Sequence, residues 1–354
     1  MRILIVCDFF VKYGSQQARS LVNLGHDVAL LARSHTVEFG GSAAEREEAL
    51  DALRRDGVQS FVVPGRVRSP SAVPKLLELR RQLRRWGPEI VHAHENYDPR
   101  LVALTSGYRT VFTVHDPVQH LGVRPLTTPK ERIFKQWFRR AERFVVHGHA
   151  LAEELAPMVD RSRIVVIPHG LSPRSEPLPP PESPSALLFG RLEQYKGVEV
   201  LAEAMRLVWE QRSGVRLVVA GSGPAARLVP DDERVSLLPK YIPESEVEEL
   251  FAHASLMVLP YTQASQSGVG ALAIAAGVPV VVSDLGALPD LAHDPSFVFE
   301  AGNPRALAQA ILRHLDNGAE VRRAVLWHAQ AHFSWDRVAQ LSTALYQDVA
   351  RNGL

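Results

Sequence analysis

Short apolar runs alternate with longer amphipathic stretches along the whole chain. In the first half the apolar runs are Ile3–Cys7, Val28–Leu31, Phe61–Val63, Ile90–Ala93, Thr110–Val114, Phe144–Val146 and Ile164–Ile167. Helical patterns lie between several of them, at Gln17–Leu24, Ala44–Arg55 and Pro74–Trp86. Runs that are apolar throughout are typical of strands buried on both faces, so the alternation predicts a parallel sheet covered by helices.

The pattern begins again after a segment rich in proline and serine. Residues Ser172–Pro184 read SPRSEPLPPPESP, which suits neither a helix nor a central strand. Further strands are predicted at Ala186–Phe189, Val215–Ala220, Val235–Leu237, Leu256–Leu259, Val278–Ser283 and Phe297–Phe299. Helices are predicted at Lys196–Arg212, Glu244–His253, Arg305–Asn317, Val321–Gln330 and Trp335–Ala350.

We therefore predict an α/β protein with two doubly wound domains. The first spans residues 1–171, a linker spans 172–185, and the second domain spans 186–330. The final segment, 331–354, is predicted to form a helix that packs back on the first domain. In two domains of this kind a ligand-binding cleft is expected where the carboxyl ends of the strands face each other.

Composition excludes some classes of protein but does not by itself identify a function. The 354 residues are 46% hydrophobic, enough for two separate cores, and the single cysteine, Cys7, rules out an internal disulfide framework. No stretch has the length and apolarity of a membrane span, and the N-terminal residues read as a strand, so a cytoplasmic location is predicted. Residues 1–170 carry a net charge of +7 and the remainder −6, which suggests that the first half faces an anionic partner.

The clearest chemical motif follows the first strand of the second half. Gly190 permits a tight turn, and Arg191 and Lys196 are expected on either side of the N-terminus of the next helix. Two cations at the positive end of a helix repel each other unless a strong anion such as a diphosphate joins them. The ordinary alternative is a pair of solvated surface cations.

A second candidate anion site lies in Pro260–Asp290. The polar residues 265–268 (SQSG) connect a buried strand to an apolar helix. Backbone N–H groups in such a loop, together with the helix dipole, favour phosphate, although the same pattern also fits an ordinary strand-to-helix turn.

Taken together, GRLEQYKG, VVAGSGP, YIPESEVEELFAHASLMVLPY and AGVPVVVSDLGALPD resemble family 4 (group 1) of the GT-B glycosyltransferases. The resemblance covers the whole chain and is strongest over residues 186–290. It implies two Rossmann-like parallel-sheet domains facing each other across a cleft. It also implies a retaining, metal-independent enzyme without a cofactor, whose donor is a UDP-, GDP- or ADP-sugar.

The resemblance implies roles for individual residues. Arg191 and Lys196 match the catalytic pair that neutralises the donor diphosphate and the leaving group. The predicted donor-binding residues of the second half are Gly190, Gly221, Gly223, Tyr241, Ile242, Ser265, Gln266, Ser267, Gly268 and Val269.

One departure from the family pattern affects the sugar site. Much of the family carries two glutamates separated by seven residues, and here Ala264 and Leu272 occupy those positions. The chain resembles a subset with an Ala-Ser-Gln-Ser-Gly-Val loop, in which Ser265, Gln266 and Ser267 would replace the first glutamate. Loss of activity is the alternative.

The first half is expected to bring the acceptor and the residue nearest the anomeric carbon. His115 and Asp116 match the family's His-Asp pair, so His115 is predicted as catalytic and Asp116 as donor-binding. His94 is predicted on the acceptor side. Gly14 lies in a reduced form of the family's glycine loop and is predicted to be donor-binding. His92 and His94 have the spacing of a metal pair, but nothing nearby in sequence completes a ligand set, and no metal is predicted.

Cations and aromatics interleave in Lys130–Arg143, as in a helix lying on an anionic membrane. The alternative is a solvated helix with inward-facing aromatics. Membrane contact would place the protein peripherally at the inner face of the cell membrane, with a lipid-linked acceptor in place of a free saccharide. No nucleic acid partner is predicted.

The function predicted from sequence is transfer of a sugar from a nucleotide-diphosphate donor to a hydroxyl acceptor with retention, in glycoconjugate synthesis. Two alternatives on the same fold stay open: a catalytically impaired nucleotide-sugar-binding protein and a sugar-nucleotide epimerase. A nicotinamide-dependent oxidoreductase would need G-x-G-x-x-G after the first strand, and CDFFVKYGSQQ lacks it.

Overall fold

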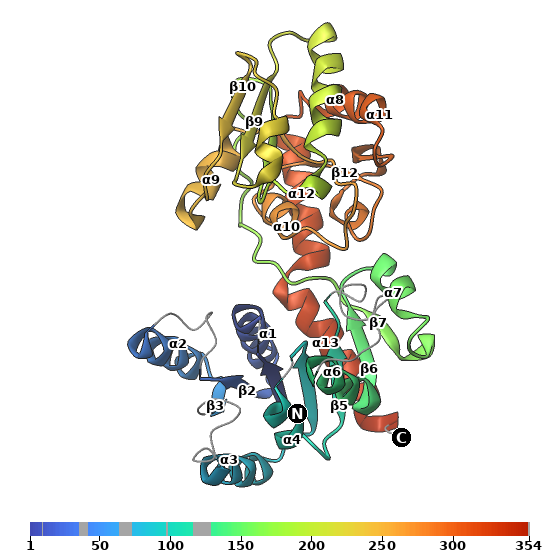
Figure 1. The fold of residues 1–354 in the computed structure, drawn as a ribbon. Helices are drawn as coiled ribbons and strands as arrows, with labels where there is room; N and C mark the ends of the chain where they lie inside the picture. The colour runs from blue at the N-terminus through green and yellow to red at the C-terminus, as the bar shows by residue number, and fades with distance from the viewer. Residues whose placement is uncertain (9, 35–41, 64–72, 97, 116–128, 353–354) are drawn as a thin grey trace. The chain divides into compact units, whose positions relative to one another are not determined.

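The structure, a computed structural model, describes residues 1–8, 10–34, 42–63, 73–96, 98–115 and 129–352. The chain divides into two compact units (Figure 1). Unit 1 comprises Met1–Gly170 together with Trp335–Leu354, and unit 2 comprises Leu171–Ser334. Each unit is built on one parallel sheet, which confirms the predicted α/β class with two parallel-sheet domains.

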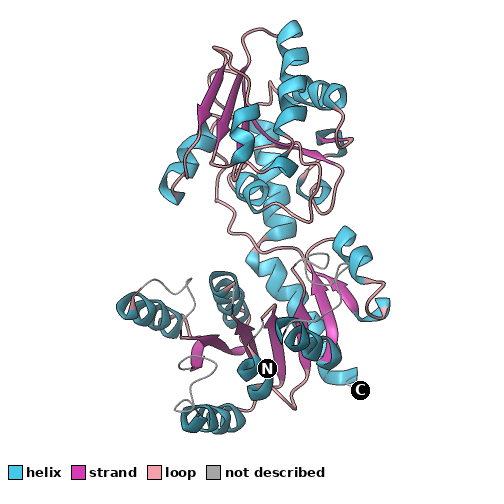
Figure 2. Cartoon of the chain, viewed as in Figure 1, coloured by secondary structure: helices cyan, strands magenta, loops and turns pink. Residues whose placement is uncertain are grey.

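The sheet of unit 1 has seven strands in the order β3-β2-β1-β4-β5-β6-β7. Their bounds are β1 Arg2–Cys7, β2 Asp27–Arg33, β3 Gln59–Val63, β4 Ile90–His94, β5 Thr110–Thr113, β6 Ala141–Val146 and β7 Ile164–Val166. Helices cover both faces (Figure 2). They are α1 Val11–Asn23, α2 Ala43–Arg55, α3 Val73–Trp86, α4 Pro99–Leu104, α6 Pro129–Arg140, α7 His149–Leu155 and α13 Trp335–Asn352.

Two apolar cores, one on each face, hold these helices to the sheet. Leu21 of α1, Leu53 of α2 and Tyr346 of α13 share the core of one face. Helices α3, α4, α6 and α7 pack on the other, where Trp137 of α6 is fully buried. The last helix of the chain is therefore an integral part of the first unit.

The sheet of unit 2 has six strands in the order β10-β9-β8-β11-β12-β13. Their bounds are β8 Ser185–Phe189, β9 Arg216–Ala220, β10 Val235–Leu238, β11 Leu256–Leu259, β12 Val280–Ser283 and β13 Val298–Phe299. Helices α8 Val198–Gln211 and α11 Pro304–His314 pack on one face. Helices α9 Glu244–Ala252, α10 Gly268–Ala275 and α12 Ala319–Phe333 pack on the other.

Strand order reverses direction once in each sheet, between β1 and β4 in unit 1 and between β8 and β11 in unit 2. In doubly wound sheets the loops at the carboxyl ends of the strands diverge at such a point and leave room for a ligand. The loops that follow β8 and β11 carry six of the predicted site residues: Gly190, Arg191, Lys196, Ser265, Gln266 and Ser267. The fold therefore supplies one candidate ligand position in each unit.

Several predicted helix boundaries were wrong. Helix α1 begins at Val11, six residues before the predicted start, and it contains Gly14, which was expected in a loop. Helix α8 begins at Val198, because Gln194–Lys196 forms a separate 3-10 turn and Gly197 adopts a left-handed conformation. Arg191 and Lys196 consequently both precede α8 instead of standing on either side of its start. Among the described helices, none has the length and apolarity that crossing a lipid bilayer requires.

Candidate active site

Four histidines gather at the carboxyl end of the sheet in unit 1. His92 and His94 point from β4, His115 follows β5, and His147 follows β6. All four are buried, with at most 6% of any one exposed. A fifth, His169, lies close by, with its ring centroid 5.2 Å from that of His147.

Three of these rings form a hydrogen-bonded chain. His94 Nδ1 lies 3.1 Å from His115 Nε2, and His115 Nδ1 lies 3.2 Å from His147 Nε2. His147 Nδ1 lies 2.9 Å from the carbonyl oxygen of Ile167, which can only accept, so this nitrogen carries the proton. With neutral rings, three protons serve four contacts, because His94 Nε2 also faces an acceptor, Gln17 Oε1, at 2.8 Å. The chain holds the ring of the predicted catalytic histidine, His115, between those of His94 and His147.

Burial keeps these imidazoles neutral. Loss of hydration, and then repulsion from His147, lower the pKa of His92 to about 3. Burial and then repulsion from His169 lower the pKa of His147 to about 3. The pKa values of His94 and His115 are also well below the ordinary value, first through burial and then through the neighbouring histidines.

Two aromatic residues enclose His115: Phe10, which immediately precedes α1, and Tyr13, which lies within it. The ring of Phe10 stacks on the imidazole at a centroid distance of 4.0 Å, and the ring of Tyr13 meets it edge-on at 5.8 Å. Phe10 has a φ of 61°, and no other described residue except glycine has a positive φ. A bulky residue in this region is strained. The cover over His115 is thus held in place at a conformational cost.

In unit 2, three loops meet where β8, β9 and β11 end. A Cβ atom on Gly221 would lie 1.8 Å from the carbonyl oxygen of Gly190, and one on Gly223 would lie 2.5 Å from that of Leu192. Val269, in the first turn of α10, would contact a Cβ on Gly190 at 3.4 Å. Gly190, Gly221 and Gly223 all have positive φ values, so backbone approaches backbone only because side chains are absent there. The structure brings together the predicted donor-binding glycines and the start of α10.

Lys196 projects into this junction and is held by Tyr261. The Lys196 ammonium lies 2.5 Å from the Tyr261 hydroxyl and 3.8 Å from the centroid of its ring. The same hydroxyl lies 2.9 Å from Ser267 Oγ, which caps α10 by accepting from the backbone N–H of Gly270 at 3.3 Å. The predicted diphosphate cation and the predicted phosphate loop are therefore directly linked.

The electrostatics of this junction favour an incoming anion. Partial burial, and then repulsion from the Arg191 guanidinium, lower the pKa of Lys196 to about 8. Burial raises the pKa of Tyr261, which stays protonated. An anion placed between Arg191 and Lys196 would relieve their repulsion.

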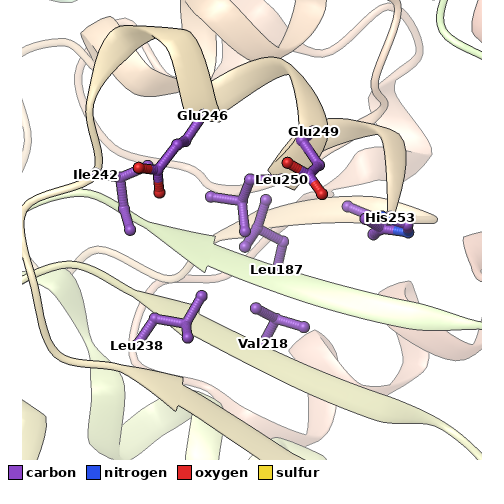
Figure 3. Close-up of a pocket in the computed structure, with 9 residues that line it drawn as sticks. Leu187, Val218, Leu238, Ile242, Glu246, Glu249, Leu250 and His253 are labelled. Atoms are coloured by element: carbon purple, nitrogen blue, oxygen red, sulfur yellow. The ribbon is translucent and has the colours of Figure 1, made fainter.

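Two other predicted donor-binding residues, Tyr241 and Ile242, differ in their exposure to solvent. Tyr241 is 78% exposed, whereas Ile242 is buried and lines an apolar pocket of about 270 Å³ between α9 and the sheet. Figure 3 shows the Ile242 side chain beside Leu238 and Glu246 in this pocket. A ligand outside that pocket can therefore reach the Tyr241 side chain and the backbone of residues 241–242, but not the Ile242 side chain.

Residues at the start of the chain differ from expectation. Gly14 is buried in α1, and a Cβ there would lie 2.3 Å from Cys7 Sγ, so this glycine serves close packing of α1 against β1. Asp116 lies outside the described residues.

The two positions that hold glutamate in much of the family are occupied by Ala264 and Leu272. Ala264 is half-buried, whereas Leu272 is exposed, with 51% of its surface accessible.

The two α6 aromatics whose side chains the structure describes, Trp137 and Phe138, do not form an exposed face for a membrane. Trp137 is fully buried and donates from Nε1 to Asn96 Oδ1 at 3.0 Å. Phe138 packs against Phe112 and Phe144. The arrangement of these two aromatics is that of the solvated-helix alternative, with the rings turned inward.

Sequence reasoning missed Tyr261 and left most of the histidine cluster unassigned. Tyr261 directly follows Pro260 at the end of β11, the strand beside β8, and that adjacency was the available signal. His147 and His169 come together with His115 only through the order of β5, β6 and β7.

Two doubly wound α/β units, each with a candidate ligand position at the switch point of its parallel sheet, are the architecture of the GT-B class of glycosyltransferases. Comparison with known proteins agrees with that class. Residues 12–174 match the model of Glycosyltransferase Family 4, and residues 183–317 match the model of Glycosyl transferases group 1. The two matches together span most of the chain, which belongs to this glycosyltransferase family.

Individual relatives are distant. The chain is 25% identical to a phosphatidyl-myo-inositol mannosyltransferase of Propionibacterium freudenreichii, over 99% of this chain and 96% of that protein. It is also 25% identical to a D-inositol 3-phosphate glycosyltransferase of Streptomyces avermitilis, over 74% of this chain but only 61% of that protein. Among solved structures, the Anabaena protein HepE in complex with UDP and glucose superposes with a TM-score of 0.66 at 15% identity, over 98% of this chain and 100% of that one. The last likeness shows the fold alone.

Proposed function

We propose that this protein transfers a sugar from a nucleotide-diphosphate donor to a hydroxyl acceptor with retention of anomeric configuration. The observation that carries the proposal is the meeting of the Gly190, Gly221 and Ser267 loops around Lys196 at the switch point of unit 2. Such a junction offers N–H groups, a helix N-terminus and two cations to a diphosphate.

In the proposed reaction, the bond from the anomeric carbon to the diphosphate oxygen breaks and a bond to the acceptor oxygen forms on the same face. The diphosphate oxygen leaves with the electron pair and takes the proton of the acceptor hydroxyl. Arg191 and Lys196 stabilise the charge that develops on the leaving group, which is the largest electrostatic requirement of the step. No protein nucleophile takes part.

Ser265, Gln266 and Ser267, with the backbone of Gly268 and Val269, are proposed to hold the donor where the family glutamates are missing. Tyr241 is proposed to contribute its backbone to the base. His115 is proposed to face the donor sugar and His94 the acceptor. Because both ring nitrogens of His115 are bonded to other histidines, a sugar hydroxyl would have to replace one of these two partners.

The acceptor class is proposed from the relatives. The similarity to a phosphatidyl-myo-inositol mannosyltransferase favours a lipid-linked acceptor over a free saccharide. Unit 1 also carries the cationic excess, including exposed Arg132, Lys135 and Arg139 of α6. Attraction of these cations to anionic headgroups would not need the buried aromatics of that helix.

The test is transfer from radiolabelled UDP-, GDP- and ADP-sugars in the presence of a cell-envelope lipid extract. We expect a labelled glycolipid with the wild-type protein and a loss of about 100-fold or more in turnover with Lys196→Ala. Lys75→Ala, which removes an exposed lysine of α3, is the matched control.

Other outcomes separate the alternatives. Binding of a nucleotide sugar without transfer or hydrolysis would indicate an impaired binding protein, as the loss of carboxylates at Ala264 and Leu272 would allow. Release of free nucleotide without an acceptor would point to an epimerase. Near-normal transfer by Lys196→Ala would contradict the proposed role of the lysine.

A further inference from the structure

We propose that Tyr261 is a positioning residue that holds the Lys196 ammonium at the diphosphate site and leaves the Ser267 hydroxyl as a donor toward the ligand. This inference rests on the proposed function and adds to it a residue for which the family resemblance assigns no role. It concerns only unit 2, where all the groups involved lie.

The direction of the hydrogen bonds follows from counting protons. The Lys196 ammonium can only donate, so the Tyr261 oxygen accepts from it at 2.5 Å. The Tyr261 hydroxyl is buried, and Ser267 Oγ at 2.9 Å is its other hydrogen-bonding partner among the described residues, so the phenolic hydrogen is directed there. Ser267 Oγ also accepts from the N–H of Gly270, so both of its lone pairs are used. Its own hydrogen remains for a third group, which must be an acceptor.

A phosphate oxygen is an acceptor of this kind, and a sugar hydroxyl can also act as one. Lys196 has two further N–H donors after its bond to Tyr261, and these also require acceptors. Lys196 and Ser267 therefore offer only hydrogen-bond donors to a ligand, one on each side of the Tyr261 hydroxyl. This polarity suits the oxygen-rich, anionic part of a nucleotide-sugar donor.

The backbone keeps Tyr261 in register with the lysine. Gly197 packs so closely on Pro260 that a Cβ atom would lie 1.7 Å from the Pro260 carbonyl oxygen. The backbone N–H of Thr262 donates to the carbonyl of Tyr195 at 2.8 Å. The turn that carries Lys196 and the segment that carries Tyr261 are thus fixed against each other on both sides. Only 1% of Tyr261 is exposed, which makes its hydroxyl an internal support and keeps it from touching substrate.

The experiment measures binding of UDP, GDP and ADP by titration calorimetry, so that it does not depend on chemistry or on an acceptor. Tyr261→Phe keeps the ring under the ammonium and removes only the hydroxyl. We expect the dissociation constant for the preferred nucleotide to rise about 10- to 100-fold, as for loss of a hydrogen bond to a charged group. Tyr195→Phe is the matched control, because its ring lies 5.1 Å from the same ammonium. This half-buried residue keeps its ring in the variant, so binding should change less than about twofold.

A double-mutant cycle separates positioning from a general structural effect. If Tyr261 acts through Lys196 and Ser267, its substitution should weaken binding much less in a Lys196→Ala, Ser267→Ala background than in the wild type. Additive losses, or unchanged binding by Tyr261→Phe, would overturn the proposal.

Two further outcomes are also decisive. If Tyr261→Phe fails to fold, Ser267→Ala takes its place in a double-mutant cycle with Lys196→Ala. Additive effects of these two substitutions on nucleotide binding would also overturn the proposal. Should the wild type bind none of the three nucleotides, the proposed function itself fails, which is a different result from normal binding by the variant.

Discussion

Acidification should destabilise unit 1 strongly, because its histidine cluster is neutral when folded. His92, His94, His115, His147 and His169 all have pKa values lowered mainly by burial, to about 3 for His92 and His147 and to about 4 for His169. In the unfolded chain each would titrate near 6.5. Between these limits the unfolded state binds more protons than the folded state, so the free energy of unfolding falls as the pH falls.

The size of the effect follows from the separation of the two pKa values. At pH 5.5 a histidine that titrates at 6.5 unfolded and below 4 folded lowers the free energy of unfolding by about 1.4 kcal/mol relative to pH 7.5. His92, His147 and His169 together give about 4 kcal/mol, and His94 and His115 act in the same direction; an ordinary domain has a stability of about 5–15 kcal/mol. Unit 1 should therefore lose a large share of its stability at pH 5.5.

Urea unfolding at pH 7.5 and 5.5, followed by pulsed hydrogen exchange and mass spectrometry, measures this unit by unit. Peptides containing β4 and β6 report unit 1, and peptides containing β8 and β9 report unit 2. His147→Gln should reduce the pH-dependent part by about 1.4 kcal/mol. His149→Gln, at an exposed histidine of the same unit, controls for substitution itself. A difference below about 1.4 kcal/mol between the two pH values in the wild-type unit 1 would show that the cluster binds protons while folded.

Three further results are expected. The ratio kcat/KM for the donor should fall as the pH rises through about 8, because the Lys196 ammonium loses its proton there; a flat profile to pH 9.5 would contradict a role for its charge. Gly197→Ala should lower the free energy of unfolding, measured in urea, by about 3 kcal/mol or more, because it places a Cβ against Pro260 at a φ of 70°. Gly214→Ala is the control and should lower it far less, because a Cβ there meets nothing within 4 Å. Trp137→Ala should lower stability by about 3–5 kcal/mol through the cavity it leaves, and should leave flotation with anionic vesicles unchanged at temperatures where the variant is folded.

The strands were readily predicted, and the reason is physical. A parallel strand buried on both faces is apolar at most positions, so β1, β8 and β11 stand out as nearly continuous apolar runs. Helix starts were harder to place, because a local turn can delay them. At Lys196 an apolar helical pattern begins before the helix does, and only the left-handed conformation of Gly197 shows where α8 starts.

The candidate site was predicted only where local motifs carry it. Gly190, Lys196 and Ser267 each follow a recognisable strand, so their loops could be expected together. The bond between Lys196 and Tyr261 joins residues far apart in sequence and has no local signal. The same holds for His92, whose ring contacts Thr113 on the next strand and the hydroxyl of Tyr346 on the last helix. Such contacts depend on the order of strands and on a helix returning to the first sheet.

That returning helix has a consequence for synthesis. The chain leaves unit 1 after Gly170 and re-enters it at Trp335, whose ring packs directly on Gly170, while Leu171 bonds to Phe333 beside the second crossing. Unit 2 is thus a contiguous insertion, and the ribosome completes it while one face of the first sheet still lacks α13. The unit that begins to emerge first is the last to bury its core, and until residues 335–352 are made the side chains that Tyr346 and Val349 will cover stay open to chaperones.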